Sequence, residues 1–209
     1  MLFRSGFKLE SGVFYNFCEM ARKDGDHKYF FIIDEINRGN MSKIFGELLM
    51  AIEADYREHD VRLAYKDEDF SVPKNLYLIG MMNTADRSLA MIDYALRRRF
   101  SFISMDPGFN TDGFKAYQNS LDSPMFNKLI DAVKALNGKI RTDESLGKGF
   151  CIGHSYFCGM ESQDCTVSRL QQIVKYDLIP TLEEYWFDNK SVLDAEVKAL
   201  KEAVNLTDE

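Results

Sequence analysis

The chain of 209 residues lacks several features that would assign it directly to a class of protein. It has no apolar run long enough to cross a bilayer, and Met1–Lys8 lacks the uninterrupted apolar stretch of a signal peptide. Its 33 acidic residues outnumber its 26 basic ones, which gives a net charge of -7. No basic surface of the kind that dominates nucleic-acid affinity is expected, so direct DNA binding is disfavoured. We expect a cytoplasmic protein with reduced thiols and no membrane association.

Cysteine is scarce, and three of the four cysteines lie near a histidine in the sequence. Cys151, Cys158 and Cys165 could be drawn together with His154 as a zinc site. However, no paired C-x-x-C knuckle is present, and the surrounding residues are aromatic and apolar. Buried structural cysteines are therefore the preferred interpretation.

The sequence does contain an apolar strand that ends abruptly in two carboxylates. Lys28–Asp34 is predicted as a strand, and its last residue is followed by Glu35. A buried strand that delivers acids to a site at its carboxyl end has this pattern. One acid could hold Mg²⁺, and the other could polarise an attacking water. A core strand followed by a solvated turn explains the stretch equally well.

A second predicted strand, Leu76–Asn83, also ends in polar residues. Ligands of parallel α/β sheets lie at the carboxyl ends of the strands. If the two strands are neighbours, Asn83 lies close to Glu35, where its amide could orient a water. The alternative makes Asn83 and Asp86 turn or cap residues, which their chemistry also favours.

Three consecutive arginines, Arg97–Arg99, end a predicted short helix at Leu89–Arg98. They could interact with the helix dipole on a solvated face, but three arginines exceed what capping requires. An exposed arginine could instead stabilise charge on a phosphate held by a neighbouring subunit.

The remaining pattern predicts a change from alternating strands and helices to helices alone. In the first half we expect helices at Val13–Arg22 and after an Asn40 cap, a hairpin within Val61–Val72 and a third strand at Phe100–Met105.

In the second half, the pattern predicts helices and no strands. They are a helix from Ser123-Pro124 to a stop at Asn137-Gly138, a helix at Thr166–Ile179 halted by Pro180, and a helix at Ser191–Val204. The expected fold class is an α/β domain followed by a helical domain.

Several blocks, in this order, resemble the AAA+ motor of the McrB family, the GTPase subunit of the 5-methylcytosine-specific McrBC restriction system. The first three are Asp34-Glu-Ile-Asn-Arg-Gly-Asn40, Met82-Asn-Thr-Ala-Asp-Arg-Ser88 and Asp93-Tyr-Ala-Leu-Arg-Arg-Arg-Phe100. The others are Leu146-Gly-Lys-Gly-Phe150, Gly153-His-Ser-Tyr-Phe157 and Leu182-Glu-Glu-Tyr-Trp-Phe187. The resemblance implies a partial AAA+ P-loop NTPase core with strands 3 to 5 of a parallel sheet (residues 1–107). An all-helical lid (residues 108–209) would follow.

The resemblance also implies a role for each candidate residue. Asp34 and Glu35 match the Walker B pair, with Asp34 organising Mg²⁺ through water and Glu35 activating the attacking water. Asn83 matches sensor 1. Arg98 and Arg99 match the arginines that reach a nucleotide, one of them in trans.

Other implications of the resemblance concern the nucleotide, its surroundings and the partners. Asp86 lies in the Met-Asn-Thr-Ala-Asp block, which implies that it helps arrange contacts at the subunit interface beside the nucleotide. His154–Tyr156 falls where a second sensor would sit, without a definite role. The resemblance implies Mg²⁺ with GTP or ATP, a hexameric ring, a nuclease partner of McrC type, and DNA bound through a separate domain.

The sequence departs from the family because no G-x-x-x-x-G-K-[ST] occurs in its 209 residues. The phosphate cradle of backbone N–H groups and a lysine is thus missing. We therefore expect a C-terminal fragment that is inactive alone, with exposed strand edges that promote self-association. Two alternatives stay open: a catalytically silent module for oligomerisation or partner binding, and an AAA+ ATPase of another system.

Overall fold

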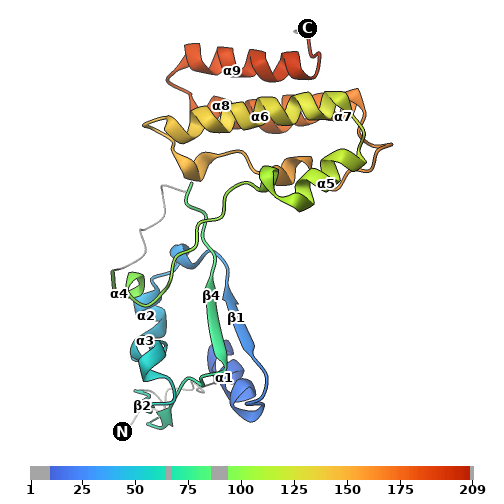
Figure 1. Cartoon of the computed structure of the whole chain (residues 1–209). Helices are drawn as coiled ribbons and strands as arrows, with labels where there is room; N and C mark the ends of the chain where they lie inside the picture. The colour runs from blue at the N-terminus through green and yellow to red at the C-terminus, as the bar shows by residue number, and fades with distance from the viewer. Residues whose placement is uncertain (1–9, 65–66, 86–93, 208–209) are drawn as a thin grey trace. The chain divides into compact units, whose positions relative to one another are not determined.

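A computed structural model describes residues 10–64, 67–85 and 94–207 and divides the chain into two compact units (Figure 1). The first unit ends at Ile103, and the second begins at Ser104. The first is α/β and the second is helical, which confirms the predicted fold class. The predicted domain limits, 1–107 and 108–209, stay a prediction. None of the helices in the described ranges has the length and apolar character needed to span a membrane.

Two parallel strands form the centre of the first unit. β1 (Tyr29–Ile33) pairs with β4 (Leu76–Gly80) along its whole length. Both strands are runs of apolar and aromatic residues, as expected for a parallel sheet. The two strands predicted from the sequence are therefore confirmed, and they are neighbours.

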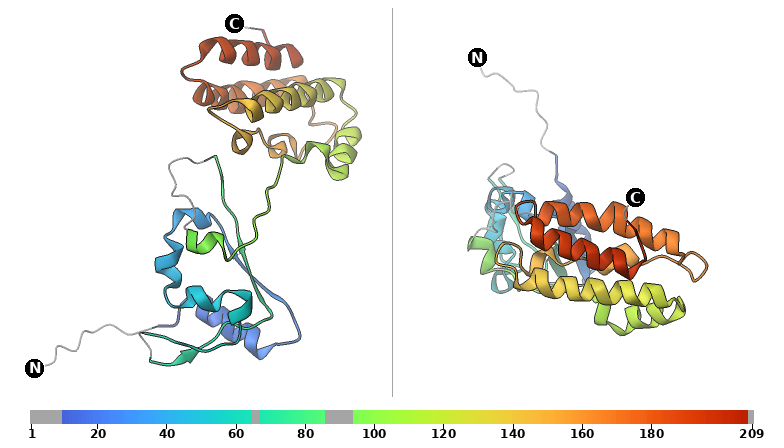
Figure 2. Two further views of the ribbon diagram at one scale, coloured as in Figure 1. Left: turned by 60° about the vertical axis from the view of Figure 1, so that its left-hand side comes forward. Right: turned by 90° about the horizontal axis from the view of Figure 1, so that it is seen from above.

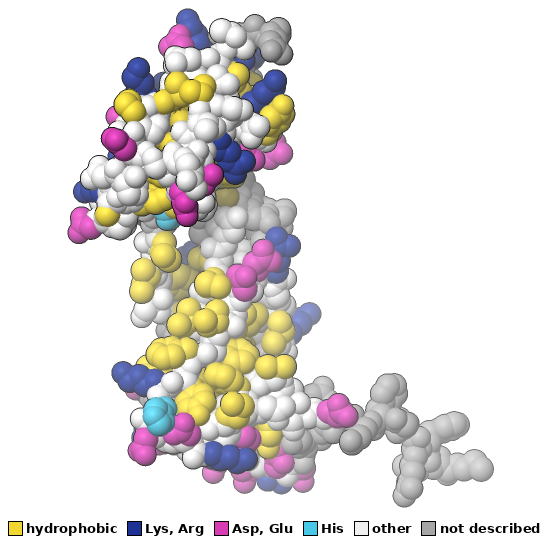
Figure 3. Space-filling view, turned by 90° about the vertical axis from the view of Figure 1, so that its right-hand side faces the viewer, with side chains coloured by type: hydrophobic (Ala, Val, Ile, Leu, Met, Phe, Trp, Pro, Cys, Tyr) yellow, Lys and Arg dark blue, Asp and Glu magenta, His cyan; other side chains and the backbone are white. Residues whose placement is uncertain are grey.

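One face of this sheet is covered by helix α1 (Val13–Lys23), which the sequence predicted. The ring of Phe31 on β1 contacts the rings of Phe14 and Phe17, with centroids 5.2 and 5.3 Å apart. The residues of the opposite face are 42–59% exposed; they are Phe30, Ile32, Tyr77 and Ile79. Hydrophobic side chains also gather on the side of the first unit shown in Figure 3.

The other elements of the first unit are short. They are η1 (Ile36–Arg38), α2 (Met41–Phe45), α3 (Leu48–Ala51), η2 (Ala54–Tyr56), the antiparallel pair β2 (Val61–Arg62) and β3 (Asp69–Phe70), and α4 (Tyr94–Arg97). The predicted cap is confirmed, because the Asn40 side chain accepts from the Lys43 N–H at 2.9 Å. Gly46, with φ of 50°, separates α2 from α3. The predicted hairpin is confirmed as β2 and β3.

The predicted strand at Phe100–Met105 is wrong. The chain has no regular secondary structure from Ser101 to Met105, and Ile103 and Met105 are 89% and 92% exposed. A strand exists only through hydrogen bonds to a neighbour, and none of the described strands pairs with this segment. Its β-branched and aromatic residues gave the right propensity, but propensity alone does not make a strand.

The second unit, called the lid below, is built around α6 (Pro124–Thr142), whose buried face forms the centre of its core. Ser123 caps this helix and Pro124 begins it, as predicted. α6 packs against α9, and α9 packs against α8 (Figure 2). The remaining elements are η3 (Gly108–Asn110), α5 (Asp112–Ser120), η4 (Lys148–Phe150), η5 (His154–Phe157), α7 (Val167–Gln172), η6 (Ile173–Leu178), α8 (Ile179–Tyr185) and α9 (Lys190–Ala203).

The predicted end of α6 at Asn137-Gly138 is wrong, because the helix continues to Thr142. Asn137 is buried, and its side-chain amide pairs with both backbone groups of Ile152. Nδ2 donates to the Ile152 carbonyl at 2.9 Å, and Oδ1 accepts the Ile152 N–H at 2.6 Å. The Asn137 side chain therefore satisfies the backbone N–H and C=O of Ile152, as a neighbouring strand would, and it does not end the helix.

The prediction that Pro180 halts a helix is also wrong. A π-helical stretch, Ile173–Leu178, leads into α8 without a break, and Pro180 occupies the first turn of α8. A π-helical turn changes the local backbone hydrogen bonding, and Pro180, which has no N–H, lies where the helix changes from π to α. The Thr181 hydroxyl also donates to the Asp177 carbonyl at 2.8 Å, which adds a bond across this junction.

Replacing Asn137 by alanine should destabilise the lid by about 2–3 kcal/mol, because both Ile152 backbone groups then lose their buried partner. Trp186 is the only tryptophan in the sequence and is 2% exposed in the lid core. Urea unfolding followed by Trp186 fluorescence therefore measures the free energy of unfolding of the lid. The exposed Asn119→Ala variant is the matched control and should change stability by less than about 0.5 kcal/mol. Equal unfolding midpoints for Asn137→Ala and the unsubstituted chain would contradict the role given to Asn137.

Candidate active site

Asp34 and Glu35 lie at the carboxyl end of β1. Backbone hydrogen bonds between β1 and the segment after β4 continue beyond the strand, on both sides of the two acids. The Met81 N–H donates to the Ile33 carbonyl at 2.9 Å, and the Ile36 N–H donates to the Met81 carbonyl at 2.9 Å. The acid pair is thus fixed on both sides to a single residue that follows β4. Both acids are exposed. Their hard oxygen donors suit Mg²⁺, which keeps several waters when carboxylates bind it.

Glu35 has an uncommon backbone conformation, with φ of 50° and ψ of 46°. A residue with a Cβ adopts this left-handed region only at a cost. The Glu35 N–H donates to Asp34 Oδ1 at 2.9 Å, and Arg38 Nε lies 2.5 Å from Glu35 Oε2. Backbone strain of this kind concentrates at functional sites, where the surrounding structure holds it in place.

Ile36 and Gly80 explain what holds this turn. Ile36 is 6% exposed and packs across Gly80, since a Cβ at position 80 would lie 2.7 Å from Ile36 Cδ1. A larger residue at the end of β4 would therefore displace the Ile36 side chain that packs under the acid pair. Neither residue was predicted from the sequence to matter for the site. The available signal was a glycine inside a strand pattern, which often marks a close approach of another segment.

Asn83 lies at the same end of the sheet as Glu35, because β1 and β4 are parallel neighbours. Its side chain is exposed, and Oδ1 accepts the Ala85 N–H at 3.0 Å. This bond is the turn contact expected under the alternative interpretation. It leaves the amide Nδ2 for another partner, so the catalytic role of Asn83 stays a prediction. Asp86 lies outside the described residues.

The two candidate arginines have different environments. Arg98 is exposed just after α4. The side chain of Arg99 is only 7% exposed, and its Nη2 lies 2.7 Å from Glu53 Oε1. Arg99 therefore anchors the chain after α4 to the interior of the first unit. Of the two, only Arg98 is exposed, and the roles of both arginines toward nucleotide stay predictions.

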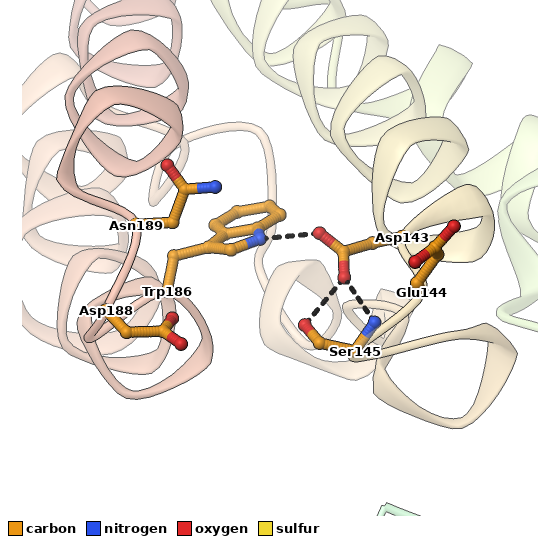
Figure 4. Close-up of a pocket in the computed structure, with 6 residues that line it drawn as sticks. All are labelled: Asp143, Glu144, Ser145, Trp186, Asp188 and Asn189. Carbon is orange, nitrogen blue, oxygen red and sulfur yellow. Dashed lines mark hydrogen bonds between the residues drawn. The ribbon is translucent and has the colours of Figure 1, made fainter.

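The lid contains a pocket of about 380 Å³ (Figure 4). Its lining residues are Asp143, Glu144, Ser145, Trp186, Asp188 and Asn189. The Ser145 hydroxyl donates to Asp143 Oδ1 at 2.7 Å, and the Trp186 indole N–H donates to Oδ2 at 2.8 Å. These bonds lower the pKa of Asp143 from 3.8 to about 2. The acidic lining does not suit a phosphate, so this pocket is not part of the candidate active site.

Comparisons with known proteins match both halves of the chain. The family described as AAA domain (dynein-related subfamily) matches residues 4–100, and the McrB alpha-helical lid domain matches residues 128–194. The chain is 50% identical over 194 residues to the Type IV methyl-directed restriction enzyme EcoKMcrB subunit of Escherichia coli (strain K12). This match covers 88% of the chain and 42% of the E. coli protein.

A second relative is the Type II restriction enzyme BsuMI component YdiS of Bacillus subtilis (strain 168). The identity is 28% over 165 residues, which covers 69% of the chain and 48% of that protein. The chain thus spans less than half the length of each of these two relatives.

The lid should lose stability in acid through Asp143. The pKa of Asp143 in the folded lid is about 2, below the ordinary value of 3.8. The stabilisation that Asp143 contributes is therefore complete above about pH 4 and is lost as the pH falls through 2. The Asp143→Asn variant should be about 1–2 kcal/mol less stable at pH 7, with a difference that shrinks toward pH 2. Urea unfolding at several pH values, followed by Trp186 fluorescence, measures this difference.

The exposed Asp194 on α9 supplies the control for this prediction. Asp194→Asn removes the same charge from the same unit without touching Trp186. A difference between Asp143→Asn and the unsubstituted chain that stays constant from pH 7 to pH 2 would contradict the assignment to Asp143.

Proposed function

Since the chain is an McrB-like AAA+ protein, with an AAA domain followed by an McrB-type helical lid, we propose that it supplies the nucleotide-hydrolysing motor of a modification-dependent DNA restriction system. The observation that supports this most is the fixed position of Asp34 and Glu35 beside Met81, at the carboxyl end of the parallel sheet. The reaction would be hydrolysis of the β–γ phosphoanhydride of GTP or ATP.

Each candidate side chain has a chemical task in this proposal. Asp34 holds Mg²⁺ through water, and the ion supplies charge neutralisation on the phosphate oxygens when bound. Glu35 takes the proton of the attacking water, and Asn83 orients that water. Arg98 stabilises charge on a phosphate bound by a neighbouring subunit. Asp86 arranges the adjoining subunit contacts.

Glu35 must leave Arg38 before it can act as the base. The 2.5 Å contact between Arg38 Nε and Glu35 Oε2 occupies the carboxylate in the described state. Both side chains are about half exposed, so the ion pair is worth no more than about 1 kcal/mol and can be exchanged for contacts with substrate.

The proposed partners follow from the same relationship. We propose a ring of subunits, a hexamer in the complete assembly, that acts with a nuclease subunit of McrC type in the cytoplasm. The name of the E. coli relative describes it as a subunit of a methyl-directed restriction enzyme. DNA would be bound by a separate domain, because the chain itself carries a net charge of -7.

A second candidate function is a catalytically silent module that keeps the ring and partner surfaces. The absence of a G-x-x-x-x-G-K-[ST] motif from the 209 residues favours it. An AAA+ ATPase of an unrelated system is a weaker candidate, because the lid matches the McrB type.

A chimera tests the proposed hydrolysis directly. The 194 residues of the E. coli protein matched by this chain are replaced with the chain, and phosphate release from GTP and ATP is measured. We expect hydrolysis by the chimera, and a loss of about 100- to 10,000-fold in kcat for Glu35→Gln with nucleotide affinity changed only a few-fold. Glu183→Gln, at an exposed position of α8, is the matched control.

The outcomes separate the two candidates. A chimera that assembles but hydrolyses no nucleotide, beside an active E. coli parent, would select the silent module. Hydrolysis that is unchanged by Glu35→Gln would remove Glu35 from the mechanism.

The 209-residue chain by itself should bind Mg-nucleotide weakly, because no lysine and backbone N–H cradle of the P-loop type is present to hold the phosphates. Calorimetric titration with GTP and ATP in the presence of Mg²⁺ measures this affinity. Micromolar binding would show that another part of the chain supplies the phosphate contacts.

A further inference from the structure

The segment that follows the first unit is attached to the lid at two points. Asp106 Oδ1 lies 3.2 Å from Lys148 Nζ and 3.5 Å from Arg141 Nη2. Two residues later, the Gly108 N–H donates to His154 Nδ1 at 3.0 Å. All of these residues belong to the second unit. An electrostatic contact and a directed hydrogen bond therefore fix the same short stretch.

The imidazole of His154 is built into its position. Its ring meets the rings of Phe109 and Phe114 nearly edge to face, with centroids 6.2 and 5.9 Å apart. Gly108 lies against the ring, since a Cβ there would be 3.1 Å from Cε1 and Nε2. Nδ1 accepts the Gly108 N–H, so it is the unprotonated nitrogen of the neutral ring. The contact requires an acceptor at the δ position of residue 154, and a Cβ at position 108 would displace the ring by a few tenths of an ångström.

Lys148 and His154 come from the two lid blocks, residues 146–150 and 153–157, for which the family resemblance gave no definite role. Ile152 lies between the blocks, and both of its backbone groups are held by Asn137. The Gly147 N–H donates to the Ile140 carbonyl at 3.1 Å, which fixes the first block to α6 as well. The two blocks therefore form a preorganised surface for the segment that they hold.

We propose that Lys148 and His154 form a latch that makes Asp106–Phe109 a rigid part of the lid, so that bending between the two units is confined to Phe100–Met105. On the other side, Arg99 is anchored by Glu53. Between the two anchors, Ser101–Met105 is exposed and has no regular secondary structure. Segments of this kind absorb the backbone changes of domain movements. This proposal does not depend on nucleotide hydrolysis.

Amide hydrogen exchange of the ¹⁵N-labelled chain, followed by NMR, tests the latch. In the unsubstituted chain we expect the Gly108 amide to be protected, while the Phe102 and Ile103 amides exchange as in unstructured chain. His154→Leu keeps apolar bulk but removes the acceptor, so Gly108 should exchange about tenfold faster. In His154→Asn, Oδ1 can take the place of Nδ1, and most of the protection should return.

The electrostatic half of the latch is tested separately. Lys148→Gln should speed exchange at Gly108 by no more than about two- to fivefold, since half-exposed ion pairs are worth little. Lys128→Gln, an exposed position on α6, removes the same charge and should change nothing. Unfolding followed by Trp186 fluorescence verifies that each variant has a folded lid. The proposal is overturned if Gly108 exchanges as fast as Ile103 in the unsubstituted chain, or if His154→Leu leaves its protection unchanged.

Discussion

The backbone pairing of β1 with β4 is the constraint on which the candidate active site depends. The ladder continues beyond both strands, through the bonds that Met81 makes with Ile33 and Ile36. Because the strands are parallel, this one ladder brings Asp34, Glu35 and Asn83 to the same end of the sheet. The side chains differ in their local contacts, but their common location is a property of the backbone. The strained conformation of Glu35 is maintained for the same reason.

The sequence predicted the features that depend on near neighbours along the chain. Apolar runs that end in polar residues predicted β1, β4 and the acid pair. Asn40 and Ser123 predicted the starts of two helices, which they cap. The same patterns misled where a partner lies far away in the sequence. Asn137-Gly138 is a typical helix stop, but the Asn137 side chain is hydrogen-bonded to Ile152 and the helix continues. Phe100–Met105 has strand propensity, but no described strand lies beside it to pair with.

Arg99 shows the same limit for the candidate site. A run of arginines suggests exposed charge, yet the buried contact of Arg99 with Glu53 depends on how the residues between α3 and η2 pack against the chain after α4. No spacing in the sequence reveals that contact. The Walker B, sensor 1 and arginine roles therefore remain proposals, although the neighbouring positions of β1 and β4 on which several of them depend are confirmed. The two units also differ in burial: the lid surrounds α6 with apolar side chains, whereas the sheet of the first unit has one apolar face exposed.

The contact between Gly80 and Ile36 has a consequence for substitutions at either position. Gly80 lies against the side chain of Ile36, which belongs to another segment. The backbone conformation of residue 80 does not itself call for a glycine. The two positions are therefore coupled: a Cβ at position 80 requires the Ile36 side chain to shift or residue 36 to become smaller, and a smaller residue 36 loosens the turn that carries Glu35. The effects of substitutions at the two positions should therefore not be additive, although neither residue belongs to the candidate acid pair.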